Sequence, residues 1–208
     1  MDSTEFPLTG EPLVLDLLNT RPQAATGPVD LLATPAGLQA WLTVQADRLP
    51  TFAGGTVVTT ADLAAVHAVR DHAAAAVERA RRGVRPSAAS LRALEAIQRA
   101  APAYRRLGWD GAAVTSTLRR TGSLGAGLAA DLAESAVDLL TDPAVTTVRE
   151  CAAPDCVLLF LPAHPRRRWC SAARCGNRAR VARYYERHKA PAAQGLPDSA
   201  RSARERSR

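Results

Sequence analysis

Apolar side chains recur every three to four residues through four stretches of the chain, a spacing that places them on one face of a helix. The four stretches span residues 34–47, 60–82, 87–101 and 123–140. The second is the clearest, because Thr60 is placed to cap its N-terminus and Gly83 follows its last turn. Thr34 before Pro35 is a similar start signal for the first. The pattern therefore predicts a mainly helical body.

Two further segments have a different pattern. Residues 10–20 are densely apolar except for Asp16 and Asn19, and they fit either a short helix or a buried strand. Residues 103–120 surround an Asp-Gly pair at 110–111, which predicts a β-hairpin with a tight turn. Aromatic residues make up only 4% of the chain, so Ala, Leu and Val must build most of the core. Ala and Leu favour helices, in agreement with the periodicity.

The positive charge of the chain is concentrated near its C-terminal end. The chain has a net charge of +7, and residues 1–150 contain slightly more acidic than basic residues. Residues 151–189 contain nine basic residues against two acidic ones, and all the basic ones except Lys189 are arginine. A basic module attached to a nearly neutral body is typical of proteins that bind nucleic acid.

The chemistry of the four cysteines depends on the compartment in which the chain resides. The first ten residues are acidic and contain no apolar run, so we expect no signal peptide. No stretch approaches the roughly 20 consecutive apolar residues of a membrane span. We therefore expect a cytoplasmic protein with no membrane partner. In that compartment cysteines that lie together are more often metal ligands than disulfides.

All four cysteines lie within 25 residues, as two C-x4-C pairs separated by thirteen residues. They are Cys151, Cys156, Cys170 and Cys175. Two close pairs joined by a loop suit the tetrahedral shell of one Zn²⁺, and a closed four-sulfur shell makes that ion structural rather than catalytic. Two disulfides or four free thiols are the alternatives, and His164 in the loop is an alternative ligand.

The residues around the cysteines predict a treble-clef-like arrangement. Residues 157–161 form a strand, residues 162–165 a turn and residues 167–170 a returning strand, after which Cys175 begins a helix to about residue 189. The fold class is therefore mainly α with a small β-hairpin (α+β). A helical domain (1–147) precedes the zinc module (148–189), and a basic tail (190–208) has the composition of a disordered segment.

The last helix has two distinct faces when it is drawn at 100° per residue. Val181, Tyr184, Tyr185 and His188 share a side that can pack on the hairpin. Arginines occupy the other side and the strand before Cys170, and they can meet phosphates, with Arg174 or Arg178 placed to read guanine in a major groove. The candidate nucleic-acid-binding residues are Arg166, Arg167, Arg168, Arg174, Arg178, Arg180, Arg183 and Arg187.

The two halves of the chain each resemble a known family. RRWCSAARCGNRARVARYY (167–185), preceded by CAAPDCVLLFL (151–161), resembles the CGNR zinc finger, which implies zinc on the four cysteines and binding to DNA. One departure is Pro-Ala-His at 162–164, where similar members carry Asp-Thr-Ser or the like. LVLDLLNT (13–20), Arg70 and SAVDLL (135–140) resemble the ABATE domain of stress-induced transcription regulators, which implies a sensor role.

Arg70 is an unusual residue for its position. It falls in the middle of the apolar stripe of the helix 60–82, where an unpaired charge is costly, and Asp16 and Asn19 are candidate partners. A structural salt bridge, or an arginine side chain that reaches to water, is one interpretation. The other is a pocket for an anion or a small effector lined by Asn19, Trp41 and Arg70.

These observations favour a zinc-containing DNA-binding regulator with a helical sensor domain. The alternative is an RNA-binding or protein-interaction module with a purely structural zinc site. We do not expect an enzyme, because the sequence has no nucleophile-base pair, no Gly-rich phosphate loop and no open metal site. A single finger buries little DNA surface, so a homodimer is also consistent with the sequence.

Overall fold

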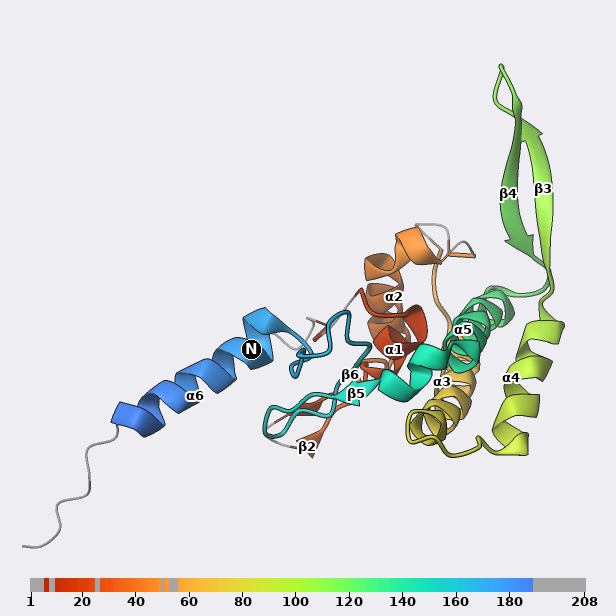
Figure 1. Cartoon of the computed structure of the whole chain (residues 1–208). Helices are drawn as coiled ribbons and strands as arrows, with labels where there is room; N and C mark the ends of the chain where they lie inside the picture. The colour runs from red at the N-terminus through yellow and green to blue at the C-terminus, as the bar shows by residue number, and fades with distance from the viewer. Residues whose placement is uncertain (1–5, 8–9, 25–26, 50, 53–55, 189–208) are drawn as a thin grey trace, which may run out of the picture.

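A computed structural model of the chain describes residues 6–7, 10–24, 27–49, 51–52 and 56–188 (Figure 1). The helices are α1 (Leu13–Leu18), α2 (Pro35–Val44), α3 (Thr60–Ala80), α4 (Ala88–Ala100), α5 (Leu124–Thr141) and α6 (Asn177–His188). The strands are β1 (Gln23–Ala24), β2 (Gly27–Pro28), β3 (Ala103–Trp109), β4 (Val114–Arg120), β5 (Arg149–Glu150) and β6 (Leu159–Phe160), in three antiparallel pairs. The predicted fold class is confirmed. Within the described residues, no helix combines the length and the apolar character needed to cross a membrane.

The core of the body lies where α3 and α5 pack along each other, with α1 and α4 against them. Val66 of α3 and Leu132 of α5 are fully buried there, together with Leu15 of α1. Gly125 allows the two long helices to approach closely, because a Cβ at this position would lie 2.8 Å from the Cα of Asp62. Of the two structures that fit residues 10–20, the helix is the one that forms.

Two of the three N-terminal caps that the sequence predicts, Thr34 and Ser87, are confirmed, and Ser123 is a further cap. Thr34, Ser87 and Ser123 each accept a backbone N–H from the first turn of the helix that follows. The cap of α3 is Thr59 rather than Thr60. Thr59 accepts the N–H of Asp62, whose carboxylate in turn accepts the N–H of Thr59, and only the residue three positions before Asp62 can make this reciprocal pair.

The predicted hairpin at 103–120 is confirmed, with a longer turn than expected. Seven residue pairs join β3 to β4, from Ala103 opposite Arg120 to Trp109 opposite Val114. The connection has four residues, not two, because the carboxylate of Asp110 accepts the N–H groups of Ala112 and Ala113. Every residue of β3 is exposed, and the hairpin stands clear of the helices (Figure 1).

Arg70 has a carboxylate partner, but not one of the two residues that the sequence suggested. It is 1% exposed, and its guanidinium donates to both carboxylate oxygens of Asp30 at 2.7 and 2.6 Å and to the hydroxyl of Thr20 at 3.0 Å. Burial raises the pKa of Asp30, but the hydrogen bonds from Arg70 and from the N–H of Leu32 outweigh it and hold that pKa at about 2. A structural salt bridge therefore occupies the centre of the apolar stripe.

Substitution Asp30→Asn is expected to destabilise the body by about 3 kcal/mol, because it leaves the buried guanidinium of Arg70 without a counter-charge. The matched control is Asp71→Asn, which removes an exposed carboxylate from its pair with Arg21 and should change stability by about 0.5 kcal/mol or less. Urea unfolding at neutral pH measures both. Equal effects of the two substitutions would show that the buried ion pair contributes no more to the stability of the body than the exposed pair does.

The stability difference between the wild-type protein and Asp30→Asn should depend on pH. The folded-state pKa of Asp30, about 2, lies below its ordinary value of 3.8, so its contribution is fully present above about pH 4. It is lost as the pH falls through about 2. Urea midpoints at several pH values should therefore converge for the two proteins in acid. A difference that stays constant down to about pH 2 would contradict the assignment.

Candidate metal centre and nucleic-acid interface

The four cysteines come together at one point of the C-terminal module. One sulfur from each of Cys151, Cys156, Cys170 and Cys175 lies within 4.8 Å of all the others, and the sulfurs of Cys156 and Cys170 are 3.9 Å apart. Sulfurs about 2.3 Å from a central Zn²⁺ at tetrahedral corners lie about 3.8 Å from one another. The donor set and its spacing fit one zinc ion.

Short local hydrogen bonds hold each pair of cysteines on its turn. The N–H of Cys151 donates to Leu158 and that of Cys156 to Ala153, which closes the first turn through Asp155 at a φ of 58°. The second turn is a π-helical segment (Ala172–Gly176) that leads directly into α6, so Cys175 lies at the entry of the helix as predicted.

Gly176 is needed at that entry because the chain passes closely over a neighbouring ring. A Cβ at this position would lie 3.2 Å from Cδ1 of Trp169, tighter than an ordinary carbon contact. The N–H of Gly176 donates to Ser171 at 2.9 Å, which fixes the π-helical turn. The packing of Trp169 and the direction in which α6 leaves the module therefore depend on the same residue.

The thiols cannot all ionise without a cation between them. Burial and the neighbouring sulfurs disfavour the thiolate at two of the cysteines, raising the pKa of Cys156 to about 11 and the pKa of Cys170 further. At Cys151 burial is outweighed by N–H groups, including that of Cys170 at 3.3 Å, and its pKa is lowered. A dication at the centre supplies the attraction that lets the remaining protons leave.

The predicted strand pairing inside the module is wrong. Leu159 and Phe160 (β6) pair with Arg149 and Glu150 (β5), not with residues 167–170, which form no strand. One backbone hydrogen bond links the returning segment to the first cysteine turn, in which the N–H of Ala152 donates to the carbonyl of Arg168. The reason is that the N–H of Cys170 turns toward the sulfur of Cys151 instead of a carbonyl.

The module is fastened to the body by the segment around α1. The side chain of Asn19 donates to the carbonyl of Leu159 at 2.9 Å and accepts its N–H at 2.8 Å. Glu11 accepts the N–H of Leu161 and pairs with Arg167 at 2.6 Å. Asn19, one of the three residues of the predicted effector pocket, is thus engaged in holding the module.

A buried carboxylate keeps this fastening in place. Asp16, 1% exposed, accepts the N–H groups of Gly10 and Glu11 and pairs with Arg48 at 2.6 Å. Burial raises its pKa, although the bonds from Arg48 and Gly10 oppose that rise. Glu11 is therefore fixed at its backbone while its side chain reaches into the module.

Two of the eight candidate nucleic-acid-binding arginines are engaged inside the module. Arg167 lies 4.4 Å over the ring of Phe160 and donates to the carbonyl of Cys170. Arg178 donates to Pro154 at 3.3 Å and to the sulfur of Cys175 at 3.5 Å. The remaining six are exposed: Arg166, Arg168, Arg174, Arg180, Arg183 and Arg187.

Helix α6 extends from the module into solvent (Figure 1). None of its residues is buried, so the expectation that Val181, Tyr184 and Tyr185 pack on the hairpin is wrong. The module instead buries its own six-residue cluster around Phe160 and the cysteines, which leaves no surface for the helix. Along α6, Tyr184 stacks on His188 at 4.1 Å.

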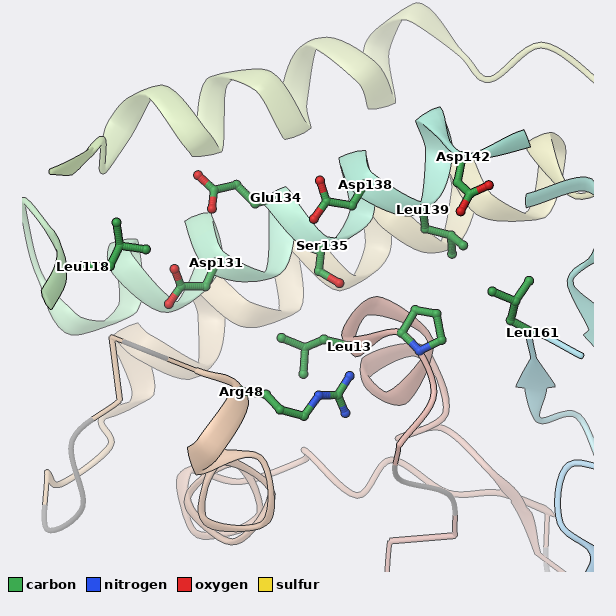
Figure 2. A pocket seen from close by; sticks show the side chains of 11 residues that line it. Leu13, Arg48, Leu118, Asp131, Glu134, Ser135, Asp138, Leu139, Asp142 and Leu161 are labelled. Atoms are coloured by element: carbon green, nitrogen blue, oxygen red, sulfur yellow. The ribbon is translucent and has the colours of Figure 1, made fainter. Parts of the chain in front are cut away.

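A cavity lies elsewhere, along α5 (Figure 2). It has a volume of about 450 Å³, and its lining does not include Asn19, Trp41 or Arg70. The pocket predicted at those residues stays a prediction. Sequence reasoning missed the α5 cavity, although carboxylates at 131, 134 and 138 recur at helical spacing and mark one face of α5.

Comparison with known families agrees with the geometry. The model of the ABATE family, described as "putative stress-induced transcription regulator", matches residues 11–143, and that of the CGNR zinc finger matches residues 147–188. No curated protein matches the chain.

Elemental analysis should find one zinc ion per chain, and Cys156→Ser should lose it to a chelator that leaves the wild-type protein loaded. The matched control is Ser171→Ala, which removes a hydroxyl beside Cys170 and one cap but no ligand. Thiol titration gives an independent measurement, with all four cysteines unreactive when zinc is bound and reactive after chelation. A protein without zinc, or one with its cysteines oxidised in pairs, would refute the site.

Proposed function

Because the chain belongs to the ABATE family and carries a CGNR zinc finger, we propose that it is a transcription regulator that binds duplex DNA through its C-terminal module. The single observation that carries the proposal is the exposed basic helix α6. None of its residues is buried, and Arg180, Arg183 and Arg187 are exposed along it. A helix of this kind fits the major groove of B-form DNA, which is about 12 Å wide.

The zinc ion supplies rigidity at the base of this helix. Cys151, Cys156, Cys170 and Cys175 would hold it, and Cys175 is two residues from the first residue of α6. An isolated 12-residue helix is marginal in water, and α6 has no core contacts of its own. The fixed turn before it and a bound nucleic acid therefore have to stabilise it together.

The exposed arginines have separate roles in this proposal. Arg180, Arg183 and Arg187 meet phosphates along α6, and Arg166 and Arg168 extend the basic surface onto the segment before Cys170. Arg174, exposed near the start of the helix, is the arginine best placed to contact a guanine edge. Arg178 is exposed as well, but its Nη2 donates to Pro154 and Cys175, so its role in this proposal is to position the cysteine turn.

The body acts as the sensor in this proposal. An effector that displaces the segment around α1 would move the module, since Asn19 and Glu11 bond directly to Leu159 and Leu161. Effector binding and DNA binding are coupled only if the affinity for the effector differs between the two positions that the module takes relative to the body.

The triple variant Arg180→Gln, Arg183→Gln, Arg187→Gln should weaken DNA binding and reduce the slope of log K against log salt by about 2.7, because each lost phosphate contact contributes about 0.9. The control carries the same change of charge on α4 and the turn before it, at Arg85, Arg92 and Arg99. Binding is measured on duplex DNA and duplex RNA at several salt concentrations, with zinc content checked for each variant.

Equal losses in the two triple variants would show that only the total charge matters and would refute a binding role for α6. Preference for duplex RNA would favour the alternative of an RNA-binding module. Absence of binding to either nucleic acid would leave a protein-interaction module as the function.

A further inference from the structure

The β3–β4 hairpin, residues 103–120, is an arm whose apolar face has no partner within the described part of the chain. Leu107, Trp109 and Val114 share one face, since Leu107 and Trp109 are two residues apart and Val114 is paired with Trp109. They are 70%, 65% and 69% exposed. A two-stranded ribbon is marginally stable in water unless its apolar face is covered. Three large apolar side chains gathered at its outer end therefore indicate a surface that another molecule covers.

The root of the arm is rigid, which fixes the direction in which it projects. Arg120, at the last pair of the ribbon, is nearly fully buried and forms salt bridges with Asp131 and Glu134 of α5. It also donates to the carbonyl of Ala101 at 2.8 Å. The arm cannot fold back onto its own body without breaking these buried ion pairs.

An acidic groove lies along α5, beginning at the root of the arm. It is the cavity of about 450 Å³ described above, with α5 as one wall, Leu13 and Arg48 opposite, and Leu161 at one end (Figure 2). Leu13, Leu139 and Leu161 give it an apolar lining. The carboxylate of Asp138 projects from α5 and has no salt-bridge partner among the described residues.

The arm and the groove have opposite charge. The arm carries Arg105, Arg106 and Arg119 in addition to the buried Arg120, against a single acidic residue at its turn. Helix α5 carries three acidic residues and no basic one, and Asp142 follows it in the lining of the groove. By the register of the ribbon, Arg105 lies on the same face as Leu107 and Trp109, whereas Arg106 and Arg119 lie on the other face. In the groove, Arg120 already pairs with Asp131 and Glu134, so Asp138 and Asp142 are the carboxylates that an incoming arginine can meet.

We propose that two copies of the chain associate by exchanging arms, so that the arm of each copy lies in the acidic groove of the other. The occupant is a second copy because the ribbon of the same copy projects away from the helices (Figure 1) and lines its own groove only near its root, at Leu118. Leu107, Trp109 and Val114 rest on the apolar lining, and Arg105, on the same face of the ribbon, meets Asp138 or Asp142. Seven strand residues extend about 23 Å, so the arm is long enough to cover residues 131–142 of the groove, which extend about 18 Å.

The exchange is self-complementary, as a two-fold dimer requires. Leu161 lies at one end of the groove, and its N–H donates to Glu11, which holds the module to the body. A dimer formed in this way presents two zinc modules, and so two α6 helices, to the same ligand. The inference about the dimer does not depend on what α6 binds.

The experiment is the mass of the full chain measured by sedimentation from about 1 to 100 μM, without nucleic acid. The arm variant is Leu107→Ser with Trp109→Ser, and the groove variant is Asp138→Arg. Matched controls are Val44→Ser with Val57→Ser, two exposed apolar residues of the body, and Glu95→Arg on α4. The wild-type protein and both controls should dimerise, and the arm and groove variants should each raise the dimer dissociation constant at least about tenfold.

Mixing the two variants distinguishes arm exchange from other dimers. In a mixture, the intact arm of the groove variant can enter the intact groove of the arm variant, so one of the two contacts is restored. The mixture should therefore contain more dimer than either variant alone. Recovery also shows that neither variant has lost its fold.

Each other outcome overturns the proposal. A wild-type protein that is monomeric throughout the range has no arm exchange. A dimer that the arm variant breaks and the groove variant does not would be held by arm-to-arm packing. Arm substitutions that reduce DNA affinity without a change in mass would make the arm a nucleic-acid contact. Stabilisation of the monomer by spermidine, lost in Asp138→Arg, would make the groove a site for small organic cations.

Discussion

The C-terminal module depends on the mutual repulsion of four sulfurs held within 4.8 Å of one another. As thiols they have little to attract one another, and as thiolates they repel, so a dication is the only component that makes the arrangement favourable. The turn that enters α6, the packing of Trp169 against Gly176 and the bond from Arg178 to Cys175 are all arranged around that cluster. The direction of the basic helix is thus set by the metal centre rather than by a hydrophobic core.

Polar groups make the specific contacts between the body and the module. Leu159 and Leu161 of the module reach the main core, but the specific contacts are the paired bonds of Asn19 and the carboxylate of Glu11. Such bonds fix one geometry, because a shifted module would leave buried polar atoms without partners. They are also more easily exchanged for water than a buried apolar contact. This combination is consistent with the sensor role proposed for the body.

Much of the fold followed from local signals in the sequence. The caps at Thr34 and Ser87 and the hairpin were predictable because each depends on residues within a few positions of one another. The metal centre was predictable because its four cysteines lie within 25 residues. The partner of Arg70, the pairing of β5 with β6 and the exposure of α6 were not, because they depend on which distant segments meet. The periodicity of α6 describes a helix with two faces, but it cannot show that the module has no surface left to cover one of them.

The arginines show why composition alone overstates an interface. Eight of them mark the module as basic, yet Arg167 and Arg178 use their donors on carbonyls, a sulfur and the carboxylate of Glu11. A nitrogen engaged in this way contributes its charge to the field around the module but is not free to donate to a guanine or a phosphate. On α6, Arg183 and Arg187 donate Nε to carbonyls of the helix itself, and their side chains are exposed, as are Tyr184 and Tyr185 between them in the chain. Exposed guanidiniums and exposed rings on one helix are the features on which its proposed role as a groove-binding element depends.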